Sequence, residues 1–95
     1  MQAVADKRAK ELATKFDHTR PNGKAWNTAI IEAKIGYKKA GENIACGQMT
    51  EAQVMNAWMN SKSHKANILN KNFTGMAVGC YEKDGVKYWV QLFVG

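Results

Sequence analysis

The spacing of apolar residues changes along this chain, and that change constrains the fold more than any other feature. Before Phe73, apolar residues recur every three or four positions in several stretches, which is the period of an amphipathic helix. From Phe73 onward they alternate with small or polar residues, which is the period of a strand. Asp84-Gly85 interrupts this second part and is typical of a tight turn. The pattern therefore predicts helices followed by an antiparallel hairpin.

Two stretches in the first third of the chain are expected to be helical. An apolar stripe predicts one helix over residues 2 to 16. A second, weaker pattern begins at Trp26 and stops near Gly36, since glycine suits the residue after a helix. The stripe of the first helix consists of Val4, Ala5, Ala9, Leu12, Ala13 and Phe16.

Two more helices are expected in the middle of the chain. Thr50 and Gln53 have the spacing of a capping box, so a helix should begin there and end near Ser61. Ser63 is placed to cap a short following helix that runs to Leu69. The residues of the first of these helices expected to be buried are Val54, Met55 and Trp58.

The second strand of the hairpin, over residues 86 to 93, has apolar or aromatic residues on both faces. It should therefore be central and covered on both sides. Because a two-stranded hairpin alone is marginally stable, a third strand is needed, from residues 44 to 47 or from the region near Tyr37. The predicted fold class is α+β, with helices packed on a small antiparallel sheet. We expect residues 1–95 to form a single domain.

The distribution of apolar and charged residues excludes some classes of protein for this chain. No apolar run approaches the roughly 18 residues of a membrane span. The first residues lack the apolar stretch of a signal peptide, so the chain is either cytoplasmic or a mature fragment whose export signal has been removed.

The net charge of +6 suggests anionic neighbours such as nucleic acid, anionic lipid or a teichoic-acid-like polymer, or simply a solvated surface. No nucleic-acid partner is expected, because no basic strand interleaved with aromatic residues and no recognition helix is present.

The chain has two cysteines, Cys46 and Cys80. An even number in a small exported domain indicates one disulfide, which would stabilise the fold by about 3–4 kcal/mol. Two buried free thiols are the alternative. Neither cysteine lies in a C-x-x-C pair, so a zinc site built on both is less favoured.

Two histidines and one glutamate are the candidate site residues. His18 follows the first predicted helix, Glu42 follows a glycine, and His64 begins a short helix. Each also has an ordinary interpretation as a turn histidine, an exposed glutamate or part of a hydrogen-bonded cluster. No metalloprotease helix motif, phosphate loop or serine-hydrolase turn is present. No local motif supports either cysteine as a nucleophile paired with a histidine, so no catalytic residue is assigned.

Four segments in this order resemble the CAP superfamily, also called SCP-like extracellular domains, in its bacterial branch. They are His18 with its following turn, Gly41-Glu42-Asn43-Ile44-Ala45, the stretch from Trp58 to Leu69, and Tyr88-Trp89-Val90-Gln91-Leu92-Phe93. The resemblance covers nearly the whole chain. It implies an α-β-α sandwich with a central cleft.

In the family that the chain resembles, the cleft holds two histidines and two glutamates, which bind a divalent metal in several members. His18, Glu42 and His64 match three of these positions, and Ser61 stands where the second glutamate would be. Two histidines and one carboxylate could hold zinc with a water molecule. Losing the second carboxylate removes one negative charge and one possible base, so weaker metal binding than with the full set is expected. Ser61 could orient the water but could not act as its base. A hydrogen-bonded His–Glu–His cluster explains the same residues.

The resemblance implies a secreted domain, extracellular or at the cell surface, that binds a lipid, a peptide or a cell-envelope component in this cleft without established catalysis. The alternative is a divalent-metal-dependent hydrolase that uses His18, Glu42 and His64. The resemblance implies a further helix before the first one here, so we expect this chain to be either a trimmed domain or a minimal member of the family. A homodimer could cover the apolar surface that the absence of this helix would leave.

Overall fold

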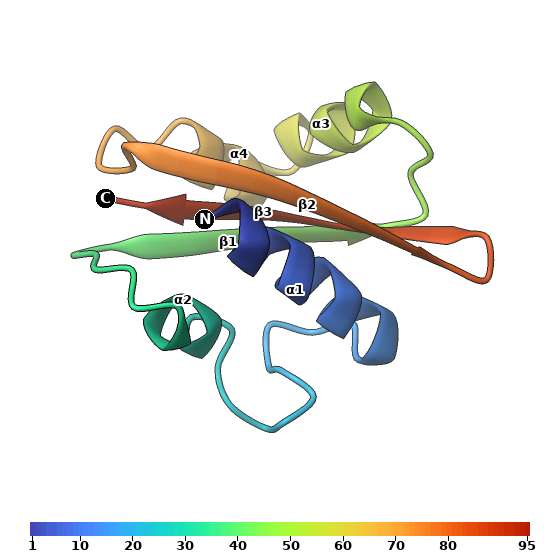
Figure 1. Ribbon diagram of the computed structural model, residues 1–95. Helices are drawn as coiled ribbons and strands as arrows, with labels where there is room; N and C mark the ends of the chain where they lie inside the picture. The colour runs from blue at the N-terminus through green and yellow to red at the C-terminus, as the bar shows by residue number, and fades with distance from the viewer.

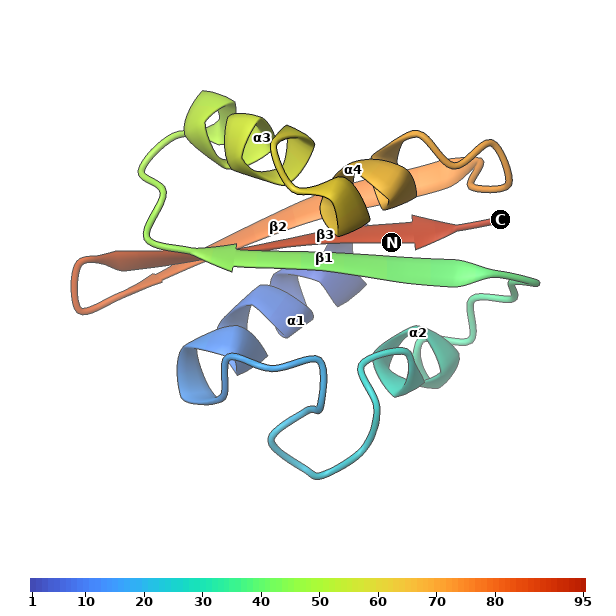
Figure 2. The same cartoon turned by 180° about the vertical axis from the view of Figure 1, so that it is seen from behind.

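The computed structural model describes all residues, 1–95. The helices and strands are α1 (Gln2–Thr14), α2 (Thr28–Glu32), β1 (Ala40–Cys46), α3 (Glu51–Met59), α4 (Lys62–Ile68), β2 (Gly75–Lys83) and β3 (Val86–Val94). Helices α1 and α2 lie on one face of the sheet, and α3 and α4 lie on the other (Figures 1 and 2). The fold is therefore the α-β-α sandwich that the sequence predicts. No helix has both the length and the hydrophobicity needed to cross a membrane.

The sheet has three antiparallel strands in the order β1-β3-β2. The predicted central position of β3 is confirmed, and β1 supplies the predicted third strand. Asp84 and Gly85 form the predicted hairpin turn with φ angles of 53° and 78°, in the left-handed region that Asp tolerates and Gly favours. Because side chains alternate along a strand, the register decides which helix layer each strand residue meets.

The core between the sheet and α1 is built by the predicted apolar stripe. Val4, Ala5, Ala9 and Leu12 are buried there together with Val90 and Leu92 of β3, among others. The backbones of α1 and β2 approach closely at Gly79, where an added Cβ atom would overlap the carbonyl group of Ala5. A glycine is therefore required at this crossing of helix and strand.

The core on the other face is smaller and is built around two tryptophans. Trp58 and Val54 of α3 pack with Ala45 and Trp89. The indole nitrogen of Trp58 donates to the carbonyl oxygen of Ile44 at 3.3 Å, which satisfies part of the exposed edge of β1.

The capping box that opens α3 is confirmed. The Thr50 hydroxyl accepts from the amide of Gln53 at 3.1 Å, and the Gln53 side chain accepts from the amide of Thr50 at 3.3 Å. Met55 of the same helix, predicted to be buried, is 37% exposed. The helix ends at Met59, two residues before the predicted end.

Other predicted helix boundaries were wrong. Helix α1 ends at Thr14, which leaves Phe16 46% exposed beside Tyr88 rather than in the core. Helix α2 has only five residues. Helix α4 begins after Ser61, whose side chain makes no capping bond, and Ser63 lies inside the helix. Propensity and caps alone do not decide such ends, because packing on the sheet overrides weak local preferences.

The prediction of a disulfide was wrong, and the sheet register gives the reason. Cys46 and Cys80 are both free and exposed. Cys46 pairs with Tyr88 and Cys80 with Trp89, on strands that flank β3. Two strand spacings separate their backbones by about 9–10 Å, whereas a disulfide needs less than about 7 Å. Tyr88 and Trp89 also point to opposite faces, so the two sulfur atoms do as well.

Candidate functional site

A buried ion pair between Glu42 and Arg8 lies at the centre of the predicted site. Glu42 faces α1, in register with Leu92, and its side chain is 0% exposed. Its Oε2 accepts from Arg8 Nε at 2.8 Å, and its Oε1 accepts from Arg8 Nη2 at 3.0 Å. Such a two-point pair between planar groups fixes the orientation of the carboxylate.

Arg8 belongs to a larger ionic network on this face. Its Nη1 donates to Glu11 at 2.9 Å, and Glu11 also accepts from Arg20. Burial alone would lower the pKa of Arg8, but the hydrogen bonds and charges of Glu42 and Glu11 outweigh burial and raise it. Burial would raise the pKa of Glu11, but the two arginines lower it. These pKa shifts favour the charged forms of Arg8 and Glu11, and the network ties α1 to the segment that carries His18.

His18 contacts the same carboxylate. Its Nδ1 lies 2.8 Å from Glu42 Oε1, and its side chain is 53% exposed. Because an ionised carboxylate only accepts hydrogen bonds, Nδ1 carries the proton and Nε2 is the basic nitrogen of the neutral ring. The arrangement could orient a general base, but no serine, threonine or cysteine side chain hydrogen-bonds to the ring.

Ser61 and His64 lie elsewhere. Both belong to α4 or its first turn, which packs on the face opposite α1 (Figure 2). The backbone oxygen of His64 accepts from Asn43, the strand neighbour of Glu42 whose side chain points to the other face. The side chain of Ser61 hydrogen-bonds only to Ser63, at 3.4 Å. The helix that carries Ser61 and His64 thus lies on the α3 side of the sheet, whereas His18 contacts Glu42 on the α1 side.

The predicted metal ligands His18, Glu42 and His64 are not assembled in this structure. No group of three or more His, Cys, Asp and Glu side chains is placed to hold a metal ion. Both oxygens of Glu42 are already bonded to Arg8, whose buried positive charge opposes a cation at the same carboxylate. The residues present therefore do not fit a zinc site.

Several site residues were missed in the sequence. Arg8 had a usable signal, since it lies four residues from both Val4 and Leu12 on the apolar stripe and so had to be buried and paired. Asn43, which is 0% exposed, had no such signal in the sequence. Its amide donates to His64 and to Gln91 and accepts from Asn67, which joins α4 to the sheet.

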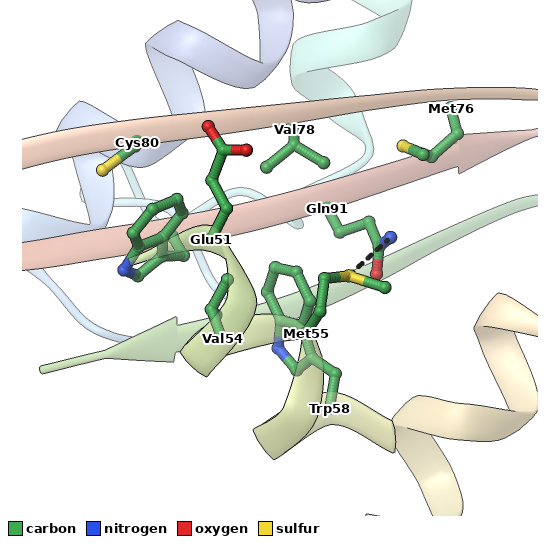
Figure 3. Close-up of a pocket in the computed structure, with 9 residues that line it drawn as sticks. Glu51, Val54, Met55, Trp58, Met76, Val78, Cys80 and Gln91 are labelled. Atoms are coloured by element: carbon green, nitrogen blue, oxygen red, sulfur yellow. Dashed lines mark hydrogen bonds between the residues drawn. The ribbon is translucent and has the colours of Figure 1, made fainter. Parts of the chain in front are cut away.

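An apolar hollow lies between α3 and the sheet (Figure 3). It has a volume of about 370 Å³, within the ordinary range of small-molecule sites. Its walls come from α3, β2 and β3, and we call it the α3 pocket. Its lining residues are Glu51, Val54, Met55, Trp58, Met76, Val78, Cys80, Trp89 and Gln91.

Gln91 supplies a polar group to this apolar wall. The residue is 1% exposed, and its Oε1 accepts from Asn43. Its Nε2 has only the sulfur atom of Met55 as a partner, at 4.0 Å (Figure 3). A thioether is a weak acceptor, so this amide can still donate a hydrogen bond to a ligand. A second hollow of about 220 Å³ shares Met55, Met76 and Gln91 and extends the apolar surface.

The sequence model of the cysteine-rich secretory protein (CAP) family matches residues 1–93. The chain belongs to the CAP family. The CAP domain is 46% identical over 80 residues to the uncharacterised protein YkwD of Bacillus subtilis, which covers 84% of this chain and 30% of YkwD. It thus spans less than a third of that relative's length.

Solved structures agree with the fold of this CAP domain. An extracellular SCP-domain protein from Bacillus anthracis superposes with a TM-score of 0.87 at 32% identity, over 98% of this chain and 30% of that one. An outer surface protein of Borrelia burgdorferi superposes with a TM-score of 0.79 at 28% identity, over 98% of this chain and 71% of that one.

Proposed function

We propose that this CAP domain acts outside the cell or at its surface, where it binds an apolar ligand of the cell envelope, a lipid or a peptide, in the α3 pocket. The observation that carries the proposal is the apolar lining of this pocket, in which Trp58, Trp89 and Val78 face a hollow of about 370 Å³. The two similar solved proteins, one extracellular and one at the outer surface of its cell, support the location.

The chemistry of the pocket favours a ligand with a long apolar part and one hydrogen-bond acceptor. Tryptophan rings provide large apolar contact areas, and methionine adapts to ligands of different shape. The free donor of Gln91 suits a carbonyl or carboxylate oxygen. Glu51, the one ionisable carboxylate at the pocket, would disfavour a second negative charge near itself.

The alternative of a metal-dependent hydrolase has less support. It needs His18, Glu42 and His64 at one centre, whereas Glu42 and the helix of His64 lie on different faces. The His18–Glu42 contact is better explained as a structural connection between β1 and the loop that follows α1. We therefore expect no hydrolysis that depends on Glu42.

Titration with dibrominated stearic acid tests the proposal, because bromine quenches tryptophan fluorescence only near contact. Trp58 and Trp89 line the pocket, so binding there should give saturable quenching. Val78→Phe should fill the pocket and weaken binding about tenfold or more. Val86→Phe, the same substitution at an exposed position beside the β2–β3 turn and outside every hollow, should not. Competition by an apolar peptide would identify the ligand as a peptide. Quenching that never saturates, or equal binding by both variants, would contradict the proposal.

A further inference from the structure

The net charge of this domain comes from two segments. Residues 33–41 and 52–81 contain no aspartate or glutamate. Their six lysines equal the whole charge of +6, because the other eight basic residues balance the eight acidic ones. These lysines are Lys34, Lys38, Lys39, Lys62, Lys65 and Lys71, and all six are exposed.

The fold brings the lysine-bearing parts of these segments toward one end of the sheet, which we call the basic end. The amides of Lys38 and Lys39 both donate to the carbonyl oxygen of Gly95, at 2.7 and 3.0 Å. Gly95 in turn packs directly against Asn72, the neighbour of Lys71. Lys38 and Lys39 thus lie near the same end of β3 as Lys71, which is 33 and 32 positions further along the chain.

Helix α4 continues the same surface. Asn67 of α4 donates to Asn43 at 2.9 Å and lies against Gly41, near the beginning of β1. Lys62 and Lys65 are on this helix and form no ion pair. In both views α4, α2 and the turn before β2 lie toward the end where β1 begins, away from the β2–β3 hairpin (Figures 1 and 2).

No aspartate or glutamate side chain neutralises the basic end. Glu32, the nearest acidic residue in sequence to Lys34, is engaged by Arg20 and Lys7. Glu42 is buried against Arg8. Six ammonium groups without counter-charges repel one another, so they favour binding of an anion that bridges them.

We propose that the basic end binds a phosphodiester polymer of the cell envelope. The cationic groups are all lysines, which attract phosphate as point charges without reading its surroundings. Both arginines of the chain are buried in ion pairs instead. Because the lysines are carried by elements from both faces of the sheet, they suit a flexible chain that wraps around the end better than a flat membrane. The inference does not depend on the α3 pocket.

Binding of the 95-residue domain to a glycerol-phosphate polymer tests this proposal. Two triple variants carry the same change in net charge. The first replaces three lysines of the basic end and is Lys38→Gln/Lys39→Gln/Lys71→Gln. The second replaces three exposed lysines elsewhere and is Lys10→Gln/Lys15→Gln/Lys24→Gln. The first should weaken binding about tenfold or more at ~100 mM salt and reduce the salt dependence of binding, whereas the second should weaken it less than about threefold. Circular dichroism verifies that both variants fold.

Three outcomes would overturn the proposal. Equal losses in the two variants would mean that net charge alone drives binding. Tighter binding to phosphatidylglycerol vesicles than to the polymer, at equal phosphate concentration, would assign the basic end to a membrane surface. Equally tight binding to polyglutamate of equal charge would mean a polyanion site that does not require phosphate.

Discussion

At the scale of single residues, the ion pair of Arg8 and Glu42 is the feature on which the site depends. A buried charge is tolerated only when it is paired and hydrogen-bonded, and here each partner satisfies the other. Glu42 in the family motif therefore has a structural role that can be tested separately from any ligand. His18 depends on it, since Glu42 is its hydrogen-bond partner.

Glu42→Gln should destabilise the domain by about 3 kcal/mol, because it leaves the buried Arg8 without its main counter-charge. The expected loss is at the low end for a broken buried pair, since Glu11 and the Asp17 carbonyl still accept from Arg8. Urea unfolding at pH 7 measures it. Glu82→Gln, at an exposed position of β2, is the control and should change stability by less than about 0.5 kcal/mol. A loss below about 1 kcal/mol for Glu42→Gln would show that the pair is not needed.

At the scale of elements, α1 and β2 are held by backbone proximity as well as by side-chain packing. Gly79 permits this proximity, because the carbonyl of Ala5 occupies the space of a Cβ atom. The apolar stripe of α1 explains why the helix packs on the sheet, but only the glycine explains how closely it does so.

Gly79→Ala should destabilise the domain by about 2–3 kcal/mol, since α1 must move away from β2 to admit the methyl group. Gly36→Ala is the matched control, because no atom lies within 4 Å of its added Cβ atom. Thermal unfolding followed by circular dichroism compares the two variants. If both unfold at the same temperature as the original chain, the close approach of α1 and β2 is not as the structure has it.

At the scale of the whole molecule, the sandwich gives each face of the sheet a different role. The α1 face holds the ion network and His18, whereas the α3 face holds the apolar pocket. The strand register alone assigns Glu42 to the first face and Asn43 to the second. A single sheet of three strands therefore separates residues that are adjacent in the motif.

The same separation predicts the chemistry of the two cysteines. Burial raises the pKa of Cys80, so labelling should be done at about pH 8.5, where thiolate is available. Treatment of the unreduced native protein with iodoacetamide should add two groups per chain, because Cys46 and Cys80 lie on strands that flank β3. Mass spectrometry counts them. A chain that takes up no label until it is reduced would contain the disulfide that this sheet order forbids.

Much of the fold was predictable from local patterns. The periods of three to four and of two, the capping box at Thr50 and the turn at Asp84-Gly85 each reflect an interaction between residues close in sequence. The motifs likewise indicated the family, and the family implied the sandwich. Helix ends were less predictable, as Phe16 and Ser63 demonstrate, because packing on the sheet decides them.

The amino-acid sequence by itself determined the order of helices and strands, the central place of β3 and the net charge of +6. Only the tertiary structure decided that Glu42 binds Arg8, that His64 belongs to the other face, and that the unbalanced lysines meet at one end. The physical reason is distance. Local geometry follows from neighbours along the chain, whereas ion pairs, thiol separation and surface charge depend on the register and sheet order that join distant segments.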